Sequence, residues 1–152
     1  MIKISNDADF KQALQGLDQA QQRIVACLFV EQVLGLSNDD RLDQAINSAK
    51  NSDASDEKIS IALKSAKAAT FDCHTRCGSE GNWTDQAGYF VGRATIAALT
   101  PLAQSKTGGP AWQAAMSCRM AQTSMLIDSD DTIPNNNDNE WQYNILSDYL
   151  NS

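Results

Sequence analysis

Apolar residues recur along nearly the whole chain at helical spacing, three or four residues apart. In residues 42–49, for example, Leu42, Ala45, Ile46 and Ala49 fall on one face of a helix. No segment shows the regular alternation of apolar and polar residues that predicts a β-strand. The pattern therefore predicts an all-α fold, a compact single-domain bundle of six or seven helices.

Capping residues and breakers divide this pattern into segments. We expect helices near residues 6–17, 18–36, 39–49, 55–77, 83–101, 110–127 and 140–149. Side chains that can cap the start of a helix stand at four of these starts. They are Asn6 or Asp7 for the first helix, Asp18 for the second, Asn38 or Asp39 for the third, and Ser55 or Asp53 for the fourth. The second helix is apolar nearly all round between Ile24 and Leu36, with Gly35 suited to its end, so we expect it to be the buried central element.

Two glycines, Gly88 and Gly92, lie four residues apart in the helix expected near residues 83–101. They share one face, where the lack of side chains lets a neighbouring helix approach closely. We interpret the pair as a packing feature and not as a recognition motif.

Net charge is concentrated at the C-terminal end. The last 25 residues hold six acids and no Lys or Arg, whereas the whole chain has 12 basic and 19 acidic residues and a net charge of −7. Residues 1–127 are therefore nearly neutral. A block of one sign stays solvated and attracts a basic partner. We expect Asp128, Asp130 and Asp131 to steer a basic protein toward this chain, with simple solubility as the alternative role.

The acidic block continues into an amphipathic segment. Trp141, Ile145, Leu146 and Tyr149 fall on one helical face, which can dock on its own core or on another chain. We divide the chain into a helical core domain at residues 1–127 and an acidic loop with a C-terminal helix at residues 128–152. We expect the second part to serve binding more than folding, with Trp141 and Tyr149 as the apolar anchors.

Cys73, His74 and Cys77 form the one cluster of candidate metal ligands. On a helix the two cysteines share a face, but His74 points about 100° away, and zinc needs four ligands. Both cysteines also continue an apolar stripe that starts at Ile59, where a thiol packs as a small apolar group. We therefore expect packing, no metal and no cofactor, with metal or thiol chemistry at these three residues as the alternative.

Several classes of function are disfavoured. The chain has no run of about 20 apolar residues and no secretory leader, so we expect a cytoplasmic protein without a membrane partner. Its basic residues are scattered, which argues against nucleic-acid binding. The sequence contains no catalytic motif and a single histidine, so no catalytic residue is assigned and enzyme activity is not indicated.

Parts of residues 23–125 resemble a helical family of bacterial toxin-immunity proteins. The carrying stretches are Val30 to Leu34, Asp39 to Leu42 with Ala45, Ile46 and Ala49, the alanine-rich run from Ala62 through Ala66, Ala68 and Ala69 to His74, Gly92 to Thr95, and Ala114 to Met116. The resemblance implies an immunity-type inhibitor whose partner is a toxin. The chain lacks the additional histidines that such proteins carry in their later helices, and the acidic end lies outside the resemblance.

These observations lead to one expectation and one alternative. We expect a protein-binding helical domain, an immunity-type inhibitor or adaptor for a basic protein partner. The alternative is a helical sensor or enzyme that uses Cys73, His74 and Cys77.

Overall fold

The computed structural model describes the backbone of residues 2–80, 83–128 and 139–152. Side chains are described for the same residues except 76–80, 83–84 and 126–128. Within these residues there are seven α-helices, two short 3-10 helices and no strand. The α-helices are α1 (Asp7–Gln15), α2 (Gln19–Glu31), α3 (Asp40–Ala49), α4 (Asp56–Glu80), α5 (Trp83–Leu99), α6 (Gly109–Asp128) and α7 (Glu140–Asn151). The 3-10 helices are η1 (Leu34–Leu36) and η2 (Leu102–Gln104). The all-α class and the helix number are confirmed.

The predicted capping residues begin the helices. Asn6 Oδ1 accepts a hydrogen bond of 2.8 Å from the amide of Asp9. Asp18 and Gln21 form a reciprocal capping box at the start of α2. The hydroxyl of Ser55 accepts from the amide three residues further on, at 3.1 Å. These bonds satisfy amide groups that a helix start leaves without a partner.

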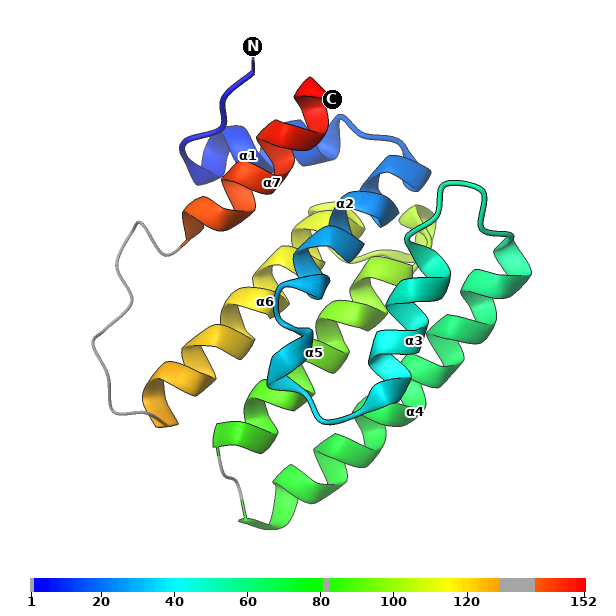
Figure 1. Cartoon of the computed structure of the whole chain (residues 1–152), viewed down its shortest axis with the longest axis vertical. Coiled ribbons are helices and arrows are strands. Elements are labelled where there is room, and N and C mark those ends of the chain that lie inside the picture. The colour runs from blue at the N-terminus through cyan, green and yellow to red at the C-terminus, as the bar shows by residue number, and fades with distance from the viewer. Residues whose placement is uncertain (1, 81–82, 129–138) are drawn as a thin grey trace.

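α2 is the central element of the bundle. It contacts α3, α5, α6 and α7, and it crosses in front of α5 and α6 in Figure 1. The long helices α4, α5 and α6 lie side by side with α5 in the middle, while α1 and α7 lie together at the end where both chain termini are found. Seven residues of α2 are buried: Gln22, Arg23, Val25, Ala26, Cys27, Phe29 and Val30. The predicted buried central helix is confirmed. No described helix is both long enough and apolar enough to span a membrane.

α2 ends earlier than the sequence indicated, at Glu31 and not near Gly35. The amides of Gln32 and Val33 donate to carbonyl groups three residues back, at 3.2 and 2.9 Å. Such bonds are the 3-10 pattern, which tightens the last turn of a helix, and the same pattern forms η1. Val33 is buried although it lies beyond the end of α2. The apolar run from Ile24 to Leu36 therefore extends from α2 into the turn that follows it.

Gly88 and Gly92 allow α4 and α5 to pack closely. A Cβ atom built on Gly92 would collide with Thr70 Oγ1 of α4, and one built on Gly88 would lie 3.6 Å from Cys73 Sγ. The interpretation as a packing feature is confirmed for Gly92. Only Gly92 is required by contact, because 3.6 Å is an ordinary van der Waals distance.

α7 packs against the core of its own chain. Leu146 is fully buried, Tyr143 is nearly so, and the Trp141 ring meets the Phe29 ring edge-on with their centroids 6.3 Å apart. The helix therefore docks in cis, the first of the two arrangements considered. The apolar face of α7 thus forms part of the core, while the expectation that residues 128–152 serve binding more than folding stays a prediction.

Candidate protein-binding surface

An open groove of about 380 Å³ lies along one edge of the contact between α2 and α7. Its apolar part consists of Leu28 from α2 with Ile145 and Tyr149 from α7. Glu31 and Asp148 line the same groove, and none of the described lining residues is basic. The groove therefore combines an apolar wall with two carboxylate groups.

α2 and α7 supply these residues because each helix has only one face fully in the core. Phe29 and Val30 point inward from α2, which leaves Leu28 and Glu31 half-buried at the helix edge. In α7 the buried residues are Gln142, Tyr143 and Leu146. Ile145 and Tyr149 are half-buried beside the exposed Asp148. The groove is formed where these two edges meet.

Of the predicted partner-binding residues, only Tyr149 lies in the groove as described. Tyr149 lines the groove, while Trp141 packs on Phe29 and has an indole N–H without a hydrogen-bond partner among the described residues. The side chain of Asp128 lies outside the described residues. The same holds for the entire residues Asp130 and Asp131. Their steering role stays a prediction.

A second exposed surface runs along α4. Five exposed residues at alternating spacings of three and four form what we call the α4 outer stripe: Ile61, Lys64, Ala68, Phe71 and Thr75. Phe71 is 69% exposed and Ile61 is 63% exposed, the highest values among the described large apolar side chains. Sequence reasoning missed both, although their signal was present: they lie off the buried stripe of the same helix. Ile61 and Phe71 stand ten positions apart on this stripe, so they are separate apolar points and not one continuous apolar patch.

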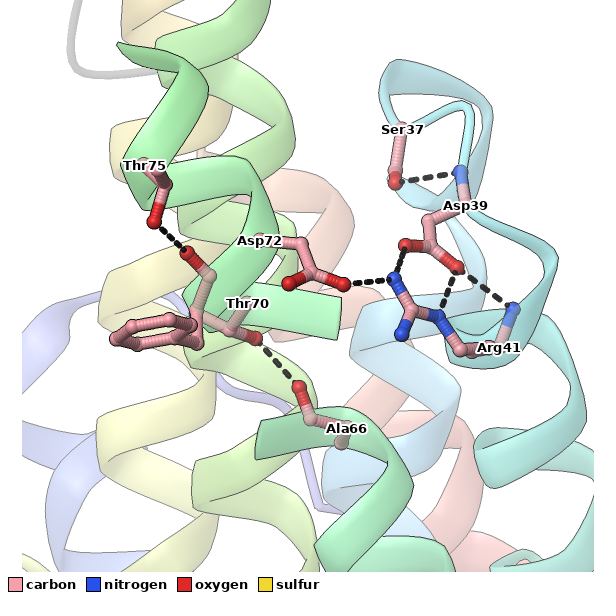
Figure 2. Close-up of polar contacts among 8 residues, drawn as sticks. Ser37, Asp39, Arg41, Ala66, Thr70, Asp72 and Thr75 are labelled. Atoms are coloured by element: carbon pink, nitrogen blue, oxygen red, sulfur yellow. Dashed lines mark hydrogen bonds and ion pairs between the residues drawn. The ribbon is translucent and has the colours of Figure 1, made fainter. Parts of the chain in front are cut away.

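An ion-pair group beside the α4 outer stripe joins α3 to α4 (Figure 2). Arg41 Nη2 lies 2.7 Å from Asp39 Oδ2 and 2.9 Å from Asp72 Oδ2. Hydrogen bonds to the two carboxylates, with that of Asp39 the larger cause, raise the pKa of the Arg41 guanidinium above its usual value. Asp72 directly follows Phe71, so the group fixes the turn of α4 that carries the exposed ring.

Cys73 and His74 do not face a common site. Cys73 is buried, and its Sγ donates to the Asp85 carbonyl oxygen at 3.3 Å. His74 is exposed, with its ring centroid 5.1 Å from that of Tyr89. The Cys77 side chain lies outside the described residues, and the described part of the chain holds no group of three or more potential metal ligands. Metal or thiol chemistry at the three residues stays an untested alternative.

Two further thiols lie deep in the core. Burial raises the pKa of Cys27 to about 12 and also raises the pKa of Cys118. Reactive cysteines need the opposite, a lowered pKa that supplies thiolate at neutral pH. These two residues therefore act as small apolar packing groups.

Comparison of the chain with protein-family models, with curated proteins and with solved structures finds no match. The resemblance to toxin-immunity proteins is therefore still a hypothesis.

Proposed function

We propose that this protein acts by binding a basic protein partner, as an immunity-type inhibitor or an adaptor. The observation that carries the proposal is the groove between α2 and α7, where Glu31 and Asp148 flank an apolar wall. The net charge of −7 and the acidic end of the chain also favour a positively charged partner. If the resemblance holds, the partner is a toxin.

The chemistry of the groove suits a lysine or arginine side chain of the partner. Such side chains bury their methylene groups against apolar surface and keep the charged end near solvent. Leu28, Ile145 and Tyr149 would contact the methylene groups, and the two carboxylates would receive the charge. Tyrosine is also enriched among residues that dominate binding energy at interfaces.

The remaining predicted residues take supporting roles in this proposal. Trp141 holds α7 on Phe29 and so keeps the groove in shape. Asp128, Asp130 and Asp131 would act at longer range, because charges steer association over roughly one Debye length, about 8 Å at physiological salt. Binding then has two parts, a short-range contact at the groove and attraction by the acidic segment.

The test uses the basic, toxin-like product of a neighbouring gene as the partner. Its affinity for this protein is measured by titration calorimetry, and inhibition is measured as rescue of growth on co-expression. Absence of binding to such a product, or the absence of one beside the gene, would count against the proposal.

Charge-matched variants locate the contact. Glu31→Gln with Asp148→Asn should weaken binding about tenfold, equivalent to 1.4 kcal/mol. Asp53→Asn with Glu57→Gln removes the same charge at exposed positions away from the groove, so it should change affinity less than about twofold. Equal losses in the two variants would show that net charge and not the groove drives binding.

Single substitutions separate the two surfaces. Tyr149→Ala should speed dissociation, because it removes a contact made in the complex. Phe71→Ala leaves the groove intact and should not change affinity. Loss of binding in Phe71→Ala alone would move the contact to the α4 outer stripe.

A further inference from the structure

Two neighbouring hollows lie on the part of the surface where η2 meets α4 and α5. The first measures about 380 Å³ and is lined by α2, α4 and the α5–η2 region. The second measures about 290 Å³ and is lined by α4, α5, α6 and the loop before α6. Thr100 and Gln104 line both, so the hollows adjoin.

The second hollow is basic in an acidic protein. Lys67 of α4, Arg93 of α5 and Lys106 of the loop before α6 line it, and none of the described lining residues is acidic. The exposed Arg93 guanidinium lies over the ring of Tyr89, 5.9 Å from its centroid, and Tyr89 itself does not line the hollow. Three separate elements thus bring positive charge to one place, although the chain as a whole carries −7.

The first hollow contains a fixed guanidinium and apolar walls. Arg23 is only 8% exposed, and its Nε and Nη2 donate to the carbonyl oxygens of Ala49 and Asn51 at 2.9 and 3.0 Å. These carbonyls lie at the C-terminal end of α3, whose dipole favours a cation. Asp56 also lines the hollow, while Ile59 and Leu63 give it an apolar wall.

We propose that the two hollows together bind a small organic phosphate. The phosphate group would occupy the basic hollow, because it carries about −1.5 to −2 charge and three acceptor oxygens, more than a single carboxylate. Arg93 supplies a planar fork of donors and the two lysines supply point charges, both established ways of holding phosphate. The carbon body of the ligand would lie on Ile59 and Leu63. This inference is independent of the protein-binding groove, which shares no lining residue with the two hollows and has the opposite charge.

The test compares three probes by amide chemical-shift changes in ¹H–¹⁵N spectra of the full chain. Inorganic phosphate tests the head group, phenyl phosphate adds an apolar body, and benzoate carries that body with a single negative charge. Phenyl phosphate should bind most tightly, about tenfold more tightly than inorganic phosphate, with shifts at residues lining both hollows. Benzoate binding as tightly as phenyl phosphate would overturn the assignment to phosphate. No saturable shifts up to about 10 mM phenyl phosphate would overturn the site itself.

Two charge-matched variants distinguish binding at the hollows from non-specific electrostatic attraction of the phosphate. Lys67→Gln with Lys106→Gln should weaken phenyl phosphate binding at least about fivefold. Lys58→Gln with Lys64→Gln removes the same charge from exposed positions outside both hollows and should change affinity less than about twofold. All four lysines are exposed, so both variants should fold, which their unshifted spectra would verify. Equal weakening in the two variants would overturn the proposal.

Discussion

Arg119 of α6 holds Asp7 at the start of α1 through a two-pronged ion pair, with Nη2 2.8 Å from Oδ1 and Nη1 3.1 Å from Oδ2. The same guanidinium donates through Nε to Gln142 Oε1 at 2.7 Å, and the Tyr143 hydroxyl donates to Asp7 Oδ1 at 2.6 Å. One arginine thereby ties together α1, α6 and α7, three elements from widely separated parts of the chain. Because Arg119 is largely buried, the removal of Asp7 leaves its charge poorly compensated.

This ion pair makes stability depend on acidic pH. The hydrogen bond from Arg119, with a further one from Tyr143, holds the pKa of Asp7 below its ordinary value of 3.8. A carboxylate whose pKa is lower in the folded state stabilises the fold above its unfolded pKa and loses that contribution as pH falls through the folded pKa. We therefore expect stability to fall progressively below about pH 4.

Urea unfolding at neutral and acidic pH measures this effect in the wild type and in Asp7→Asn. The variant should lose less stability on acidification, by about 0.5–1 kcal/mol, a value discounted because Asp7 is half exposed. Asp40→Asn, at the first position of α3, serves as the control and should behave as the wild type. An identical acid dependence in Asp7→Asn and the wild type would contradict the assignment.

The two glycines of α5 should respond in opposite ways to alanine. Gly92→Ala places a methyl group against Thr70 Oγ1 and should cost about 1–3 kcal/mol, as overpacking does. Gly88→Ala meets Cys73 Sγ only at 3.6 Å, so the better helix propensity of alanine should make it neutral or stabilising by up to about 1 kcal/mol. Denaturant unfolding measures both. Thr70→Ala combined with Gly92→Ala should recover part of the loss, and additive effects would argue against a direct contact.

Neighbouring residues of α2 should differ strongly in their contribution to stability. Phe29 is fully buried, with its ring centroid 5.7 Å from that of Phe10, so Phe29→Ala should cost about 3–5 kcal/mol. Leu28 is half-buried at the edge of the α2–α7 groove, so Leu28→Ala should cost about 1 kcal/mol. Unfolding midpoints of the two variants test the difference, and equal costs would contradict the observed orientation of α2.

Local elements could be predicted from the sequence because short-range rules determine them. Leu42, Ala45, Ile46 and Ala49 were assigned to one face of a helix, and all four are buried. The capping residue Asp18 marked the start of α2 to within one residue, since its side chain satisfies a backbone amide nearby.

Long-range relationships could not be predicted in the same way. An amphipathic face such as that of α7 shows that a helix packs on something, but not whether the partner surface belongs to the same chain. The pairing of Arg119 with Asp7 spans 112 positions, and no spacing rule connects them. The same limit applies to the groove and the hollows, whose walls come from several helices each. The sequence indicated the residue types of a binding surface, and only the fold brought Tyr149, Glu31 and Leu28 together.

α7 should be required for folding, which reverses the expectation drawn from its acidic surroundings. Leu146 is fully buried, and the Gln142 side chain donates to the Ala115 carbonyl at 2.9 Å while accepting from Arg119. Removal of the helix would expose Phe29 and leave these buried polar groups without partners, which is costly.

We therefore expect a chain lacking residues 139–152 to aggregate or to lose most of its cooperative unfolding transition, measured by circular dichroism on heating. Leu146→Ala should cost about 2–5 kcal/mol, whereas Asn144→Ala on the exposed face should change stability by less than about 0.5 kcal/mol. The point variants matter because they keep the helix and its charge while altering only its packing. A truncated chain that retained its helical signal and its unfolding midpoint would contradict the structural role, and it would restore α7 as an element that serves binding alone.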